Sequence, residues 1–215
     1  MENNNISGVK TIELFAGTKS FSKVAESLGH KTFTTDYEEV DGQDLVADVC
    51  TLTKEDFPYK PDILWASPPC EGFSVASIGK NWGGGYRAYE PKSESAKRSI
   101  MLVEETLRLI KELKPMYYFI ENPRGVLRKL DLLNYVPRYT VTYCQYGDTR
   151  MKPTDIWTNF PFIPRPMCKN GGKCHVSAPR GSKTGTQGIK GYKDRSRIPP
   201  DLFVDIFSQF NDIII

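Results

Sequence analysis

Short apolar runs alternate with helical patterns along this chain, and that alternation restricts the fold more than any other feature of the sequence. The clearest helix is expected over residues 94–113, where apolar side chains recur at spacings of three and four on one face. The alternation predicts a mostly parallel, twisted α/β sheet with helices on both faces and a hairpin formed by the last two strands. The expected strands are 9–15, 31–36, 61–66, 116–120, 139–144 and 155–160, and the other expected helices are 21–28 and 199–210.

Length and hydropathy limit the class of protein. A chain of 215 residues can bury one core and leaves little for a second domain. The mean hydropathy is -0.44 and no apolar run approaches the roughly 20 residues of a membrane span, so we expect no membrane insertion. The amino terminus lacks the layout of a signal peptide. We therefore expect a cytoplasmic protein whose five cysteines are reduced.

The basic residues are concentrated near the carboxyl end. Residues 150–197 contain 11 Lys and Arg but 2 Asp and Glu, a local charge of +9, whereas the whole chain carries +3. Such a cluster favours binding to a phosphate backbone, because neutralising phosphates releases counterions. A solvated basic loop is the other interpretation.

Three unusual motifs directly follow predicted strands. They are FAG at 15–17, SPPC at 67–70 and ENP at 121–123. In an open α/β sheet, ligands bind outside the carboxyl ends of the strands. We therefore expect these three motifs to meet at one edge of the sheet.

The first motif indicates a nucleotide-binding turn. Gly17 lets the backbone approach a ligand at the start of a helix. Asp36, at the end of the next strand, stands where a carboxylate can hold ribose hydroxyls, and Asp48 is a candidate contact to an adenine ring. The alternative for each acid is a turn or cap residue.

The second and third motifs fit covalent catalysis. Two prolines before Cys70 stiffen the backbone and can aim its side chain, although a free cysteine is more often an inert core residue. A thiolate that adds to C6 of cytosine makes C5 nucleophilic enough to accept a methyl group. That addition needs an acid at N3, and Glu121 with a raised pKa can serve.

In order and spacing, these motifs resemble those of the C5-cytosine-specific DNA methyltransferase family. ELFAG at 13–17 with FS at 21–22 is similar to its cofactor motif, PPCEGFS at 68–74 to its nucleophile motif, ENPRG at 121–125 to its glutamate motif and IPPDL at 198–202 to its closing segment. The resemblance implies a Rossmann-like class I methyltransferase fold and S-adenosyl-L-methionine as cofactor. It implies Cys70 as nucleophile and Glu121 as the N3 partner. The implied cofactor-binding residues are Phe15, Ala16, Gly17, Asp36, Tyr37, Asp48, Val49 and Pro68.

The chain departs from the family pattern at three places. Lys19-Ser20 replaces Gly-Gly, and Pro123 replaces Val. In the family's arginine-rich motif, Lys152 and Thr154 replace the two arginines. We expect Arg150 and Lys152 to share the catalytic task of holding the base.

The substrate implied by the resemblance is a cytosine flipped out of double-stranded DNA, because C6 is out of reach inside a duplex. Residues 71–89 are rich in glycine and aromatic side chains and are expected to form a lid, with a disordered surface loop as the alternative. The expected nucleic-acid contacts are Ser74, Trp82, Arg87, Arg124, Lys183, Lys190 and Arg195.

The expected organisation is a catalytic domain at 1–160, a short basic target-recognition region at 161–196 and a terminal helix at 197–215. Because this target-recognition region is short, we expect a recognition sequence of only a few base pairs. Within it Cys168, Cys174 and His175 have the character of metal ligands. Because a structural zinc site needs four ligands and no fourth is nearby in sequence, we expect no metal.

Two alternatives remain open for the function. The same chemistry would serve an RNA cytosine-5 methyltransferase, and a catalytically degenerate module could bind DNA or cofactor without turnover. We expect a monomer without an obligatory protein partner, encoded by a phage or mobile element.

Overall fold

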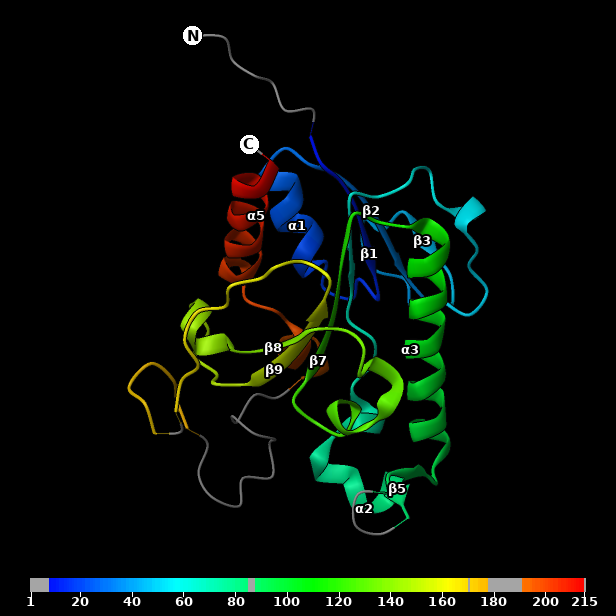
Figure 1. The fold of residues 1–215 in the computed structure, drawn as a ribbon, viewed down its shortest axis with the longest axis vertical. Coiled ribbons are helices and arrows are strands. Elements are labelled where there is room, and N and C mark those ends of the chain that lie inside the picture. Colours follow the sequence, from blue (N-terminus) through cyan, green and yellow to red (C-terminus); the bar gives the residue numbers. More distant parts are fainter. Residues whose placement is uncertain (1–7, 85–87, 170, 178–190, 215) are drawn as a thin grey trace, which may run out of the picture.

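The computed structural model of the chain describes residues 8–84, 88–169, 171–177 and 191–214, and its centre is one large sheet (Figure 1). The strand order is β3-β2-β1-β4-β7-β9-β8, and β9 alone runs antiparallel to its neighbours. This confirms the predicted mostly parallel sheet and the pairing of its last two strands. The strands are β1 (Lys10–Leu14), β2 (Lys31–Asp36), β3 (Leu45–Val46), β4 (Ile63–Ala66), β7 (Tyr117–Pro123), β8 (Arg138–Thr142) and β9 (Pro153–Thr158).

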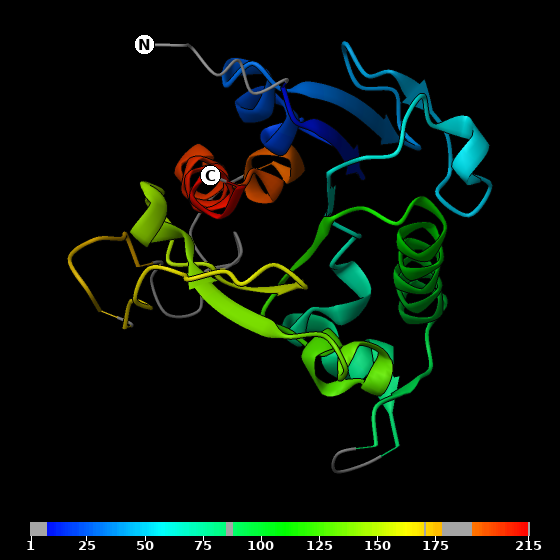
Figure 2. The same cartoon turned by 45° about the horizontal axis from the view of Figure 1, so that its top comes forward.

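Helices cover both faces of the sheet, as expected. Figures 1 and 2 show α1 (Ser20–Ser27) and α5 (Pro200–Ile214) side by side on one face and α3 (Glu94–Leu113) on the other. The bounds of α3 match the predicted helix, because Ser93 caps its first turn by accepting a hydrogen bond from the Ala96 N–H. The last helix continues beyond the predicted residue 210 to Ile214.

Successive side chains of β4 point to opposite faces of the sheet and pack into the apolar core on each face. Trp65, which is fully buried, stacks on Phe21 of α1 with ring centroids 5.6 Å apart and meets Phe203 of α5 edge-on at 4.9 Å. Leu64 and Ala66 face the opposite way and pack in the cluster that includes Leu102 of α3. A strand buried on both faces is typical of a parallel sheet.

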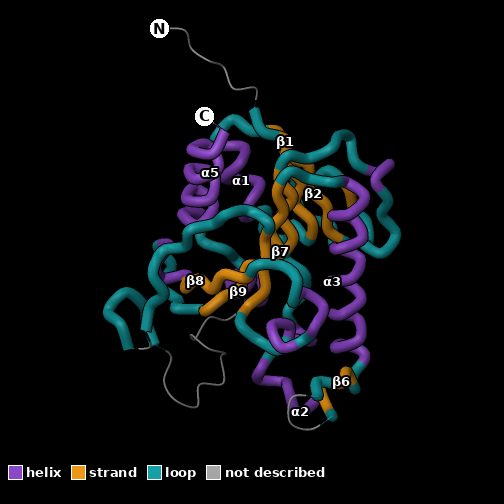
Figure 3. Tube along the Cα trace, in the orientation of Figure 1, coloured by secondary structure: helices purple, strands orange, loops and turns teal. Residues whose placement is uncertain are grey.

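Much of the segment expected to be a glycine-rich lid is folded (Figure 3). The Trp82 indole N–H donates to the Gly72 carbonyl oxygen at 2.6 Å, and the Asn81 amide donates to the Glu71 carbonyl oxygen at 3.1 Å. These bonds fold the segment back on itself against α3. Its elements are η2 (Glu71–Phe73), η3 (Val75–Ser77), α2 (Ile78–Asn81) and β5 (Trp82–Gly83), which pairs with β6 (Glu90–Pro91).

The remaining short elements lie in the connections. They are η1 (Lys54–Asp56), η4 (Leu127–Lys129), η5 (Asp131–Leu133), η6 (Tyr143–Tyr146) and α4 (Tyr192–Ser196), of which α4 falls in the stretch expected to be loop. No helix in the described ranges has the length and apolar character that a bilayer crossing requires.

Candidate active site

The three predicted motifs meet at one edge of the sheet. Strands β1, β4 and β7 are parallel neighbours, and their last paired residues bring Leu14 beside Ala66 and Ala66 beside Ile120. The chain therefore leaves β1 and β4 at the level where Glu121 stands on β7. The prediction that these motifs converge is confirmed.

Two carboxylates accept hydrogen bonds from the turn after β1 and from the helix that follows it. Gly17 has φ +49°, and its N–H donates to Asp36 Oδ2 at 2.9 Å. Buried Glu13 accepts hydrogen bonds from the Ser22 N–H at 2.9 Å and the Ser22 hydroxyl at 2.6 Å, which fixes the start of α1. Burial raises the pKa of Glu13 to about 7, against the effect of these bonds. The sequence analysis placed Glu13 in the motif but missed this capping role.

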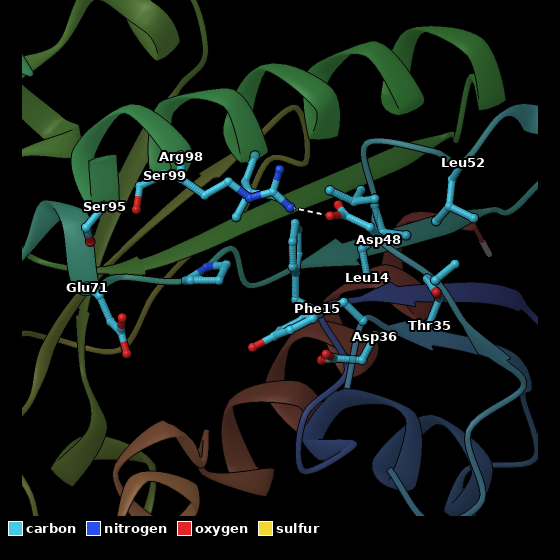
Figure 4. A pocket seen from close by; sticks show the side chains of 15 residues that line it. Leu14, Phe15, Thr35, Asp36, Asp48, Leu52, Glu71, Ser95, Arg98 and Ser99 are labelled. Atoms are coloured by element: carbon cyan, nitrogen blue, oxygen red, sulfur yellow. Dashed lines mark hydrogen bonds and ion pairs between the residues drawn. The ribbon is translucent and has the colours of Figure 1, made fainter. Parts of the chain in front are cut away.

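A cavity of about 360 Å³ opens beside this turn (Figure 4). That volume lies in the usual range for small-molecule sites. Five predicted cofactor residues line it: Phe15, Asp36, Tyr37, Asp48 and Val49. Ala16, Gly17 and Pro68 are not among its lining residues, and Pro69 takes the place expected for Pro68, which is buried.

Side chains from α3 complete the cavity wall. Arg98 crosses the cavity to form an ion pair with Asp48 (Figure 4). Partial burial opposes ionisation of Asp48, but the Cys50 N–H and the Arg98 guanidinium lower its pKa, so the carboxylate stays charged. The sequence analysis missed the other lining residues: Leu14, Thr35, Ala47, Leu52, Glu71, Ser95, Arg98, Ser99 and Leu102.

One polar atom of this wall has no protein partner. The Thr35 hydroxyl is buried, with the residue 2% exposed, and its Oγ1 has no hydrogen bond within the described part of the chain. A buried hydroxyl without a partner carries a desolvation penalty. Thr35 therefore lines the cavity with its hydroxyl buried and unpartnered among the described residues.

Cys70 lies where the chain turns after β4. The Asn122 side-chain amide of β7 donates to the Pro68 carbonyl oxygen at 2.9 Å, which ties the Pro-Pro segment to the neighbouring strand. Burial raises the pKa of the Cys70 thiol, the Glu121 charge raises it further, and the Lys152 charge lowers it. The thiol therefore feels both the negative charge of Glu121 and the positive charge of Lys152.

Glu121 and Lys152 also act on each other. Glu121 is 5% exposed and accepts a hydrogen bond from the Tyr143 hydroxyl at 2.8 Å. Burial raises its pKa, and the Lys152 charge and the Tyr143 hydrogen bond oppose that rise. Burial lowers the pKa of Lys152, and Glu121 opposes that change. The Lys152 ammonium also lies 4.9 Å from the centre of the Tyr143 ring and donates to the Arg195 carbonyl oxygen at 2.9 Å.

Arg150 does not reach out to hold a base, contrary to expectation. Its guanidinium is 5% exposed and pairs with both oxygens of Asp148. Its remaining N–H groups donate to the carbonyl oxygens of Asp194, Arg195 and Arg197 at 2.8 to 3.0 Å. Because every guanidinium N–H has an acceptor, Arg150 is a clamp between the β8–β9 turn and the start of the terminal segment.

The family profile of the C-5 cytosine-specific DNA methylases matches residues 5–140, which is more than half of the chain. The chain belongs to this family. The matched region contains the turn after β1, the Pro-Pro-Cys segment and Glu121, so the predicted resemblance is confirmed.

Two viral proteins are similar to this chain. One, from Frog virus 3 (isolate Goorha), bears the name "Probable DNA (cytosine-5)-methyltransferase" and is 29% identical over 92% of this chain and 98% of its own length. The other, the type II methyltransferase M.CviJI of Paramecium bursaria Chlorella virus IL3A, is 28% identical over 59% of this chain and 36% of its own length.

A solved structure supports the fold. A protein described as a DNA modification methyltransferase encoded within an E. coli prophage superposes with a TM-score of 0.50 at 16% identity. The superposition covers 70% of this methylase and 46% of that chain, so this chain corresponds to about half of the solved one.

The predicted nucleic-acid contacts of this methylase fall into three groups. Ser74 is half-buried, and Arg124 and Arg195 are exposed. Trp82 is 5% exposed and stacks on Phe73, so its side chain packs inside the segment after Cys70, which argues against the predicted DNA contact. Arg87, Lys183 and Lys190 lie outside the described residues.

The three residues predicted to have the character of metal ligands lie beside a fourth potential ligand. The ligand atoms of Cys144, Cys168, Cys174 and His175 all lie within 4.8 Å of one another. Cys144 belongs to η6, far from the others in sequence, which is why the sequence analysis found no fourth ligand. The reason for expecting no metal is therefore removed.

Proposed function

We propose that this family member transfers a methyl group from S-adenosylmethionine to C5 of cytosine in DNA. The observation that carries the proposal is the grouping of Cys70, Glu121 and Lys152 at the sheet edge, where the charges of Glu121 and Lys152 act on the Cys70 thiol and on each other. The adjoining cavity gives the cofactor a place beside the thiol, because Pro69 and Glu71 on either side of Cys70 line it.

The residues present fit this cofactor. Asp36 and Asp48 supply carboxylates for ribose hydroxyls and the adenine amino group, and Phe15, Val49 and Leu52 supply apolar wall. The unpartnered Thr35 hydroxyl gives one further polar contact. When bound, S-adenosylmethionine supplies an electrophilic methyl group on a positively charged sulfur.

Cys70 acts as the nucleophile in this scheme. Its thiolate forms a bond to C6 of cytosine, and the displaced ring electrons are neutralised by a proton from Glu121 at N3. C5 then accepts the methyl group, and the electron pair of the broken S–CH3 bond stays on the donor sulfur as a neutral thioether. Loss of the C5 proton to water and return of the N3 proton to Glu121 restore the C5–C6 double bond and expel the Cys70 thiolate. Burial raises the pKa of Glu121, which favours the protonated carboxyl that this step requires.

The positive charge of Lys152 shifts the pKa of both Cys70 and Glu121. Its positive charge lowers the pKa of the Cys70 thiol and opposes burial and the negative charges of Glu121 and Glu71, which raise it. A cation is needed most when Glu121 is ionised, since two negative groups would otherwise face each other. We assign Lys152 to activation of Cys70 and Arg150 to holding Lys152's segment in place.

The DNA is proposed to lie over the exposed side of this edge, where Arg124 and Arg195 can contact phosphates. The cytosine must leave the duplex to reach Cys70. We propose residues 161–196 as the short recognition region between a catalytic domain at 1–160 and the terminal helix.

A methyl-transfer assay tests the proposal. The full chain is incubated with cofactor labelled in its methyl group and with duplex DNA or RNA, beside Cys70→Ser. Label in DNA with the wild type and none with Cys70→Ser is expected. Label only in RNA would mean that the substrate is RNA and not DNA. Label in neither nucleic acid would overturn the enzymatic proposal. The affinity of Cys70→Ser for the cofactor should stay within about twofold, so that lost label reports chemistry.

A further inference from the structure

A cluster of three thiols and one imidazole lies apart from the proposed catalytic residues. Cys144 lies on η6, while Cys168, Cys174 and His175 lie in the connection that follows β9. Cys168 Sγ lies 3.1 Å from Cys174 Sγ, and Cys174 Sγ lies 3.6 Å from Cys144 Sγ. His175 Nδ1 lies 3.5 Å from Cys168 Sγ and 3.7 Å from Cys174 Sγ.

Three of these four separations are close to the edges of a tetrahedral zinc site, and the Cys168–Cys174 separation of 3.1 Å is shorter. With Zn–S near 2.3 Å and Zn–N near 2.0–2.1 Å, tetrahedral angles place two sulfurs about 3.8 Å apart and sulfur and nitrogen about 3.5 Å apart. A disulfide between Cys168 and Cys174 would involve two of the sulfurs and leave Cys144 and His175 without a reason to converge. The four atoms together fit one central ion.

The chain between Cys168 and Cys174 is shaped to bring their sulfurs together. Gly171 has φ +84°, a conformation that favours glycine. A Cβ on Gly172 would lie 2.9 Å from Cys168 Sγ, 3.2 Å from the Lys169 carbonyl oxygen and 3.6 Å from Cys174 Sγ. Gly171 and Gly172 therefore let the backbone pass close to the two thiols.

Hydrogen bonds hold the two halves of the cluster in register. The Cys168 N–H donates to the Thr142 hydroxyl at 2.9 Å, and the Val176 N–H donates to the Thr149 carbonyl oxygen at 2.8 Å. These bonds join the segment carrying three ligands to residues on either side of η6. The ligand atoms are thus presented from a supported framework.

We propose that Cys144, Cys168, Cys174 and His175 bind one Zn²⁺ ion. The three thiols lose their protons to solvent on binding, and the neutral imidazole coordinates through Nδ1. Three sulfurs and one nitrogen suit zinc, and four protein ligands leave no open position, so the ion is structural. It fastens the connection after β9 to η6, immediately beside Tyr143, the residue that contacts Glu121.

Metal content tests this site without reference to activity. The full chain is purified under reducing conditions with Zn²⁺ and then dialysed. Inductively coupled plasma mass spectrometry should then find about one zinc ion per chain. Cys174→Ser should retain at least tenfold less, whereas Cys50→Ser, a cysteine outside the cluster, should retain the same amount as the wild type.

A second measurement keeps the test decisive if Cys174→Ser does not fold. Wild-type protein loaded with Co²⁺ should develop the strong visible absorption of tetrahedral cobalt bound to thiolates, and Zn²⁺ should remove it. A wild type that retains no zinc and gives no cobalt spectrum would overturn the proposal. So would an intact mass two hydrogen atoms lower in reducing buffer, because that result means a Cys168–Cys174 disulfide.

Discussion

Replacing Tyr143 by Phe removes one hydroxyl from the centre of the proposed active site. Tyr143 is fully buried, and its hydroxyl donates to Glu121 Oε1 at 2.8 Å. Burial raises the pKa of Tyr143 well above its ordinary value, so the hydroxyl keeps its proton and remains a donor. That hydrogen bond favours the ionised form of Glu121, and its loss favours the protonated form.

The size of the effect follows from the burial of both partners. A hydrogen bond to a charged group contributes roughly 1.5–3 kcal/mol, which corresponds to about a ten- to hundredfold change in the ratio of ionised to protonated Glu121. If protonated Glu121 serves N3 of cytosine, Tyr143→Phe extends activity to higher pH. The alkaline limb of the kcat/KM profile should therefore move upward.

The assay is methyl transfer to DNA as a function of pH. Tyr139→Phe is the matched control, because Tyr139 is half-buried on β8 and its ring packs against Phe162 at 5.8 Å. The control should keep the wild-type profile. Coincident alkaline limbs for wild type and Tyr143→Phe would refute the role of Glu121 as the acid.

Three further predictions address the cofactor cavity, the turn after β1 and the lid. Thr35→Val removes an unpartnered buried hydroxyl, so calorimetry should find cofactor binding about five- to tenfold weaker while thermal stability stays equal or rises. The Glu13 carboxyl has a folded pKa of about 7, above its unfolded value, so it contributes stability at acidic pH that is lost as pH rises through 7. The free energy of unfolding from urea titrations should fall by about 2.5 kcal/mol more between pH 5 and pH 8 in the wild type than in Glu13→Gln, and equal falls would contradict this. Trp82→Phe should lower stability by about 1–3 kcal/mol and leave the Kd for DNA unchanged, whereas tenfold weaker binding would return Trp82 to the DNA interface.

The fold and the reactive groups were predictable because their signals are local. Apolar periodicity located α3, and the rule that ligands bind at the carboxyl ends of parallel strands placed Gly17, Cys70 and Glu121 together. The structure confirms their convergence at the ends of β1, β4 and β7. Each position follows from where one strand ends.

The missed features depend on contacts between distant segments. Arg98 reaches the cavity because α3 crosses the sheet beside Asp48, and Cys144 meets Cys168 because the chain after β9 returns to η6. Arg150 looked like a free base-holding cation, but its donors are taken by Asp148 and three carbonyl oxygens. Partners such as these cannot be counted from spacing in a single sequence.

Covalent trapping on DNA that contains 5-fluorocytosine tests the central claim most directly. Fluorine at C5 cannot leave as a proton does, so the bond between Cys70 Sγ and C6 should persist once the methyl group has been transferred. With cofactor present, wild-type protein should give a protein–DNA adduct that survives denaturation, and peptide mapping should place it on Cys70. Wild-type protein that methylates ordinary cytosine but forms no adduct, or an adduct that persists in Cys70→Ser, would contradict the account.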